Sequence, residues 1–243
     1  MYRWYWWSSF ALMGMLLAAC GLQVINGSGN VVTEARPVSN FNAVSLSGTG
    51  ELTIIQGESE ALTVEAEDNV MSHLRTEVRN GTLTLGLAHE SWLQVVRPTQ
   101  PIKFKLTVKK LTDLDLSGSG SIQAATLTTD QLAVTVSGSG DLEFAQLAAT
   151  NLTCTISGSG KAQFAGAVTG QTVVISGNGD YQAGNLKSQT GQITVSGSGQ
   201  VTVWVQTALD VEISGSGMVN YYGAPKLSTE ISGSGQIKDL GDK

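Results

Sequence analysis

Two stretches of the sequence contain residue types that could bind an ion. Gly-Ser-Gly-Lys at residues 158–161 is similar to the end of a phosphate-binding loop, but that loop also needs Gly at 155 and Ser or Thr at 162, where Thr155 and Ala162 stand. Glu212 and Glu230 each precede a repeated Ser by two residues, so we expect neighbouring outward carboxylates. A cation could bridge them, but a hard cation prefers six or more oxygens, which favours two solvated acids.

The histidines do not form a metal-binding pattern, and the repeats do not contain a catalytic cluster. His73 and His89 have no cysteine or second histidine at ligand spacing, so we interpret them as surface residues and expect no metal and no cofactor. Residues 117–243 contain no His and no Arg, and polysaccharide-cleaving enzymes need clustered carboxylates, often with a base or calcium. We therefore expect no catalytic residues, and an enzyme acting on polysaccharide is the least favoured of three alternatives.

Trp204 and Tyr222 are the residues that best suit recognition. They occupy equivalent outward positions of successive repeats, where earlier repeats have only Ala or Gly. Adjacent exposed aromatic rings suit the face of a sugar or a partner protein. The alternative, which we favour, is that the C-terminal segment or a neighbouring chain covers them, because the end of a repeat array needs covering.

Cys20 ends a segment that suits export and covalent attachment of lipid. The segment has one positive charge, Arg3, then an apolar run over residues 10–19 and the small-residue sequence Leu-Ala-Ala-Cys. It resembles a bacterial lipoprotein signal, which implies removal of residues 1–19 and a lipid on the Cys20 sulfur. An uncleaved membrane helix is the alternative, but the apolar core is shorter than the roughly 20 residues that a span needs.

Composition excludes one class of partner. The formal charge is −6, and it would be −7 after loss of Arg3, so nucleic-acid binding has no basic surface to use. Export would leave Cys154 as the one thiol without a lipid, so no disulfide can form within the chain. We expect partners to be the membrane through the lipid, a glycan or surface protein, or further copies of the chain, in a bacterial cell envelope.

A Ser-Gly tetrapeptide between apolar flanks recurs at nearly constant spacing. The tetrapeptides begin at Ser117, Ser137, Ser157, Ser176, Ser196, Ser214 and Ser232, and Ser47 begins an earlier copy. Such a period predicts a solenoid. Gly reaches positive φ without steric cost, so each tetrapeptide is predicted to be a tight corner between two strands rather than a flexible linker.

Aligning the repeats sorts the side chains into columns. Positions three and one before the Ser and five and seven after it are mostly apolar, which predicts inward-facing residues on strands. A column ten residues after the Ser, Leu127, Leu147, Ala167 and Leu186, predicts a third short strand. We therefore predict an all-β fold, a right-handed parallel β-helix with coils of 18–20 residues, in which Cys154 is buried and unreactive.

The chain before the regular repeats is β by pattern but less periodic. We predict a tether over 20–40, a less regular β region over 41–116, and a regular β-helix with a C-terminal cap over 117–243. Asn80-Gly81 predicts a hairpin turn, and residues 102–108 alternate as a half-exposed strand. Residues 88–101 are predicted to form a loop.

The sequence resembles one known family over roughly residues 31–240. The features that carry the resemblance are "FNAVSLSGTGELTIIQG", "LTVEAEDNVMSHLRTEVRNGTLTL", "IKFKLTVKKLTDLDLSGSG" and the succession of SGSG corners. They are similar to the head GIN domain family of "putative autotransporter adhesins". The resemblance implies a right-handed β-helix, frequent lipid anchoring and no established activity.

We therefore expect a lipid-anchored, non-enzymatic envelope protein that acts as a rigid stalk or binding module. Its first alternative is a scaffold that stacks through exposed coil ends, as filaments or closed oligomers, because an end coil offers unpaired strand edges.

Overall fold

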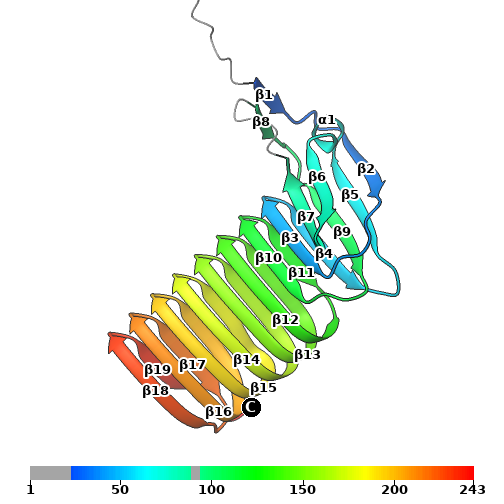
Figure 1. Ribbon diagram of the computed structural model, residues 1–243. Coiled ribbons are helices and arrows are strands. Elements are labelled where there is room, and N and C mark those ends of the chain that lie inside the picture. Colours follow the sequence, from blue (N-terminus) through cyan, green and yellow to red (C-terminus); the bar gives the residue numbers. More distant parts are fainter. Residues whose placement is uncertain (1–22, 89–93) are drawn as a thin grey trace, which may run out of the picture.

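A computed structural model describes residues 23–88 and 94–243, and within these ranges the chain forms a β-solenoid of stacked parallel coils (Figure 1). The predicted all-β solenoid is confirmed. The strands of the solenoid are β3 (Ala43–Gly48), β4 (Glu51–Gln56), β10 (Asp113–Gly118), β11 (Ser121–Ala124), β12 (Leu127–Gly138), β13 (Asp141–Gly158), β14 (Lys161–Gly177), β15 (Asp180–Gly197), β16 (Gln200–Gly215), β17 (Met218–Tyr222), β18 (Lys226–Gly233) and β19 (Gln236–Asp239). No helix in the described ranges is long and apolar enough to cross a membrane.

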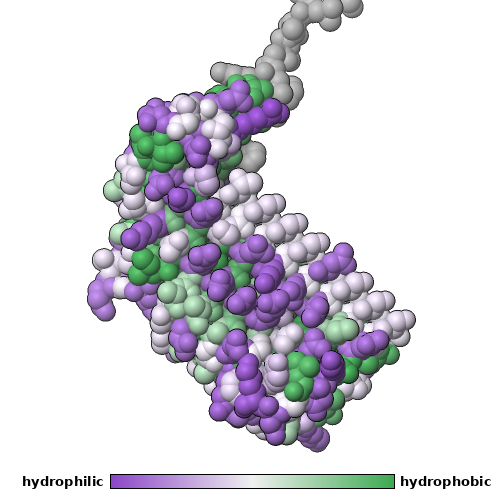
Figure 2. Space-filling view, turned by 180° about the vertical axis from the view of Figure 1, so that it is seen from behind, coloured by the Kyte–Doolittle hydropathy of each residue, from purple (hydrophilic) through white to green (hydrophobic). Residues whose placement is uncertain are grey.

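The Ser-Gly tetrapeptides form one edge of the stack. The first Ser of each copy pairs in register with the first Ser of the next, from Ser47 to Ser232. Figure 2 shows this edge as a stepped row of nearly white surface, the hydropathy expected of small Ser and Gly residues. The copy at Ser47 is therefore the first coil of the solenoid, although 70 residues separate it in sequence from Ser117.

Two backbone hydrogen bonds tie each corner to the coil before it. The N–H of Ser159 donates to the carbonyl oxygen of Gly138 at 2.8 Å, and the N–H of Lys161 donates to that of Gly140 at 3.0 Å. Gly158 has a φ of +125°, and a Cβ atom built on it would lie 2.5 Å from the Gly138 oxygen. A side chain is thus excluded both by the backbone conformation and by the coil beneath.

Up to β16, the predicted inward columns three and one before the Ser and five and seven after it are buried. Leu116, Val136, Ile156, Ile175, Val195 and Ile213 are at most 1% exposed, and Cys154 lies between Val134 and Val173 with no exposed surface. Burial raises the pKa of the Cys154 thiol far above its ordinary value, which leaves it protonated and unreactive.

One predicted core residue is displaced. Ala167 is exposed, and Gly166 instead lies between Leu147 and Leu186. The coil that contains it is one residue shorter than the coil before, and the register shifts between Phe144 and Leu147 to absorb the difference.

The chain leaves the solenoid after the first coil and builds a closing layer. This insertion contains β5 (Ala61–Glu67), the one-turn helix α1 (Asp68–Met71), β6 (Leu74–Arg79), β7 (Thr82–Leu87), β8 (Gln94–Arg97) and β9 (Lys103–Val108). Strands β7 and β9 pair in parallel with β3 and β4, and β6 and β5 then pair antiparallel on their far sides. The predicted Asn80-Gly81 hairpin is confirmed between β6 and β7.

The N-terminal segment has more structure than a tether would. Strand β2 (Val31–Arg36) pairs antiparallel with β5, and β1 (Gln23–Asn26) pairs in parallel with β8. Part of the segment predicted as a loop is therefore β8. Its strand character was missed because its partner is 71 residues away in sequence and only four residues pair.

We predict that Gly158→Val lowers the free energy of unfolding by about 2–4 kcal/mol, because backbone strain and the clash with Gly138 add together. Ser159→Val is the matched control, since Ser159 is exposed one residue further along the same corner. Denaturant titration measures both variants. Equal stability of Gly158→Val and the wild-type chain would contradict the corner assignment.

Candidate functional site

The aromatic surface, defined as Trp204 and Tyr222, lies on one side of the solenoid near its C-terminal end. The two residues pair in register across β16 and β17, as the repeat alignment predicted, and both are half-buried. The pairing of Trp204 with the preceding coil differs from the prediction. Trp204 pairs with Lys187 rather than Gly184, because residues 184–186 form a bulge in β15.

The bulge creates a hollow beside Tyr222. Gly184 has no side chain, and a Cβ atom there would lie 3.3 Å from the Tyr222 ring. The hollow has a volume of about 240 Å³, and its polar walls come from Gln163, Gln182, Asn185, Thr202 and Lys243. One aromatic ring beside several amide side chains is a combination that can stack on a ligand and also hydrogen-bond to it.

The chain's own C-terminal residue lies over the aromatic surface. The Lys243 Nζ is 4.9 Å from the centre of the Tyr222 ring and 5.9 Å from that of Trp204, and it donates a 2.8 Å hydrogen bond to the Gly184 carbonyl oxygen. Lys187 approaches Trp204 from the neighbouring coil at 5.6 Å. All three contacts have the geometry of cation–π interactions. The C-terminal residue thus covers part of this surface and leaves both rings accessible.

A buried polar chain fixes the backbone of Trp204. The Tyr181 hydroxyl donates to Gln171 Oε1 at 3.0 Å, Gln171 Nε2 donates to the Ser188 hydroxyl at 2.7 Å, and that hydroxyl donates to the Trp204 carbonyl oxygen at 2.9 Å. Tyr181 has no exposed surface, and burial raises the pKa of its hydroxyl well above the ordinary value. Each member has a partner, so the chain can be buried without an unsatisfied group.

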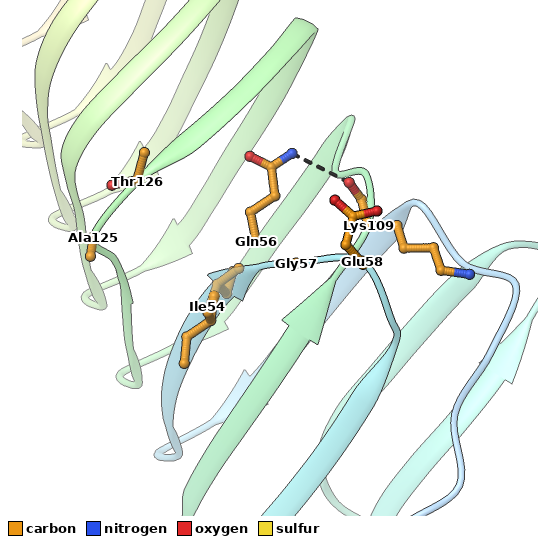
Figure 3. A pocket seen from close by; sticks show the side chains of 8 residues that line it. Ile54, Gln56, Gly57, Glu58, Lys109, Ala125 and Thr126 are labelled. Carbon is orange, nitrogen blue, oxygen red and sulfur yellow. Dashed lines mark hydrogen bonds between the residues drawn. The ribbon is translucent and has the colours of Figure 1, made fainter.

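A larger hollow lies elsewhere, where the third wall of the first coil is missing (Figure 3). Its volume is about 570 Å³. The Gln56 amide substitutes for the absent strand: Nε2 donates to the Thr128 carbonyl oxygen at 2.9 Å, and Oε1 accepts from the Thr128 N–H at 2.8 Å. Glu58 and Lys109 are the only charged residues in the lining, so we assign no chemistry to this hollow.

Glu67 forms a structural clamp that the sequence did not reveal. Its carboxylate is 1% exposed and accepts hydrogen bonds from the backbone N–H of Gly29 at 2.7 Å, from that of Thr99 at 2.8 Å, from the Thr99 hydroxyl and from the Gln100 N–H at 3.3 Å. The Thr99 hydroxyl is the main cause of a lowered Glu67 pKa, which outweighs the opposing effect of burial.

Asp68 and Asn69 extend the clamp to the same N-terminal segment. Asp68 accepts hydrogen bonds from Ser28 and Asn30, chiefly the Ser28 hydroxyl, and these lower its pKa. Asn69 donates to the Asn26 carbonyl oxygen at 2.8 Å. The three consecutive residues thus hold residues 27–30 in a loop outside the solenoid.

The remaining predicted ligands do not form a metal centre. Glu212 and Glu230 are register neighbours on the outward face, as predicted, and with Asp210 they line a hollow of about 290 Å³. Across residues 23–88 and 94–243, no group of three or more His, Cys, Asp and Glu side chains is placed to hold a metal ion. His73 is half-buried, while His89 and Cys20 lie outside the described residues. Residues 158–161 form a corner and the start of β14.

A family model described as "Putative auto-transporter adhesin, head GIN domain" matches residues 40–225. The chain belongs to this family. The match includes the first coil, the closing layer and all of the solenoid up to β17, and it confirms the resemblance drawn from the sequence. No curated protein matches the chain.

Solved structures share this GIN-domain fold. A "putative adhesin" from Bacteroides fragilis NCTC 9343 has a TM-score of 0.81 at 24% identity, with 89% of this chain and 100% of that one covered. A "putative lipid binding protein" from Parabacteroides distasonis ATCC 8503 has a TM-score of 0.73 at 25% identity, with 90% and 100% covered. A "putative adhesin" from the same organism has 0.72 at 21%, also with 90% and 100% covered.

We predict that Glu67→Gln releases the N-terminal segment, because an amide cannot accept from the four donors that the carboxylate satisfies. The measurement is amide hydrogen exchange in peptides covering residues 27–30 and 99–100, with Glu65→Gln as the matched control. Glu65 lies on the same strand, but its side chain is 44% exposed and forms an ion pair with Lys103.

The pH dependence of this clamp follows from the lowered pKa. The stabilisation is present above the ordinary Glu value of 4.5 and is lost as the pH falls through the lower folded-state value. At acidic pH, amide hydrogen exchange in the wild-type chain should therefore approach the exchange seen in Glu67→Gln. Equal exchange of the two chains at pH 7 would contradict the clamp.

Proposed function

We propose that this protein is a lipid-anchored binding module of the bacterial cell envelope, of the adhesin class, without catalytic activity. The family and its structural neighbours are named as adhesins or as a lipid-binding protein, which supports a surface role. The rigid stack of coils supports a stalk that holds a binding surface away from the membrane. Cys20 is the attachment point in this proposal.

The observation that carries the binding site is the hollow beside Tyr222. It combines the Tyr222 ring with amide and hydroxyl side chains from three successive coils, and Trp204 lies beside Tyr222 on the adjacent strand. A pyranose offers an apolar face and a rim of hydroxyl groups, so a glycan matches both parts of this surface. The bulge at residues 184–186 supports this assignment because it leaves space that regular stacking would fill.

Glycan-array screening of the full-length protein tests this site. We expect Trp204→Ala and Tyr222→Ala to lose at least about 1 kcal/mol of binding free energy, roughly fivefold in affinity, by removing stacking area. Gln206→Ala is the control, since Gln206 is exposed two residues from Trp204 and lies outside the hollow. No bound glycan, or a bound glycan that both aromatic variants retain, would contradict the proposal.

Lipid attachment has a separate test. Cells that express the chain and receive a labelled fatty acid should incorporate label into the wild-type protein and not into Cys20→Ser. The wild-type chain should fractionate with membranes, and the variant should be released from them. Cys154→Ala is the control, because the buried thiol should make no difference. Equal labelling of the wild type and Cys20→Ser would contradict the anchor.

A further inference from the structure

The two ends of the solenoid are built differently. At the N-terminal end, β7 and β9 cover the first coil, and their inward residues Leu83, Leu85, Phe104 and Leu106 are at most 1% exposed. Antiparallel strands β6 and β5 then end the parallel stacking. Figure 1 shows the other end, at β18 and β19, with no further layer beyond it.

The last coil keeps the inward pattern of the coils before it but leaves those residues exposed. Leu227 is 39% exposed and Ile231 is 45% exposed, whereas Leu209 and Ile213 at the same positions of the preceding coil are each 1% exposed. Every residue of β18 is exposed. Figure 2 shows hydrophobic surface at this end, at the lower right. Lys243, the last described residue, does not cover it, because its Nζ donates to the Gly184 carbonyl oxygen on the side of the solenoid.

The same coil also has free backbone edges. Among the described residues, β18 pairs only with β16, and β19 pairs only with β17. Alternate N–H and C=O groups of both strands therefore point along the stack without a partner strand. An exposed edge of this kind accepts another strand readily, and natural proteins usually block it with charge, proline or a covering element.

Net charge does not repel a second copy from this edge. Strands β18 and β19 carry Lys226, Glu230, Lys238 and Asp239, so the end coil is neutral although the whole chain has a formal charge of −6. Glu230 of β18 pairs in register with the like-charged Glu212 of β16, and this repulsion is unfavourable at strand spacing. A cation on the open side of Glu230 would offset that repulsion.

We propose that two copies of this protein dock head to head through β18 and form a closed two-fold dimer. A two-fold axis through Ser228 pairs β18 with its copy in antiparallel orientation and sets Lys226 of each chain opposite Glu230 of the other. The inward residues Leu227 and Ile231 are then covered from the partner side. Hydrogen bonds between the two β18 strands satisfy the free edge.

The proposal selects the closed oligomer from the two assemblies, filaments or closed oligomers, that the repeat suggested. A filament needs the open end of one copy to dock on the opposite end of the next. That opposite end has no parallel coil edge, because the antiparallel strands of the closing layer cover it. Head-to-head contact uses the same surface twice and therefore stops at two chains.

Disulfide trapping in intact cells tests the dimer with the full chain. Ser228→Cys places a thiol on the two-fold axis, where antiparallel neighbours are close enough for a disulfide. We expect an oxidant to produce a disulfide-linked dimer of this variant and none of Ser139→Cys, an equally exposed serine at a mid-solenoid corner. The wild-type chain controls for the two native cysteines.

A second variant separates docking from chance encounter. Adding Ile231→Lys to Ser228→Cys places two like charges in the interface, so the linked dimer should be lost while the melting temperature of the purified chain is unchanged. Equal linking of Ser228→Cys and Ser139→Cys, linking that survives Ile231→Lys, or a ladder of higher oligomers would each overturn the closed dimer.

Discussion

The close contact between the glycine of one corner and the carbonyl oxygen of the corner below is the constraint on which the rest of the structure depends. A Cβ atom on the first Gly of any corner from Gly118 to Gly233 would lie 2.4–2.7 Å from that oxygen. The contact is closer than any real Cβ atom makes, and the same glycines have φ between +117° and +128°. Only Gly satisfies both conditions, which is why direct stacking of the corners requires Gly at this position.

Stacked corners fix the register of everything between them. Because side chains alternate along a strand, a fixed register decides which residues face the core and which face solvent. Coils that differ in length by one or two residues must take up the difference away from the corner. The bulge at residues 184–186 is such a place, and the aromatic surface and its hollow lie beside it. The bulge that absorbs a difference in coil length thus also creates the candidate binding site.

Structural features that recur in every coil could be predicted from the sequence, whereas contacts that occur only once could not. The corners, the inward columns and the burial of Cys154 could be predicted because seven similar copies expose each position's preference. The Glu67 clamp and the Gln56 amide could not, because each depends on a partner more than 30 residues away that no repeat marks. The pairing of Trp204 with Lys187 instead of Gly184 was missed because alignment from the corner assumes coils of equal length.

The exposed coil at β18 and β19 is also a consequence of the repeat. A repeat can always accept one more copy, so an end coil keeps a free edge unless another kind of structure covers it. The insertion between the first and second coils supplies such a cover at one end, and the sequence supplies none for β18 within the described residues. The asymmetry gives the protein one closed end, one open end and a side surface, each suited to a different contact.

Hydrogen exchange at the corner amides tests the central claim most directly. The N–H groups of Ser139, Ser159, Asn178, Ser198 and Ser216 each donate to the corner below at 2.8–2.9 Å. The account predicts that, in the full-length protein, these amides exchange as slowly as those of the flanking strands, despite lying in Ser-Gly sequences. Exchange at the rate of an unstructured chain would show that the tetrapeptides are linkers and would contradict the stacked-corner fold.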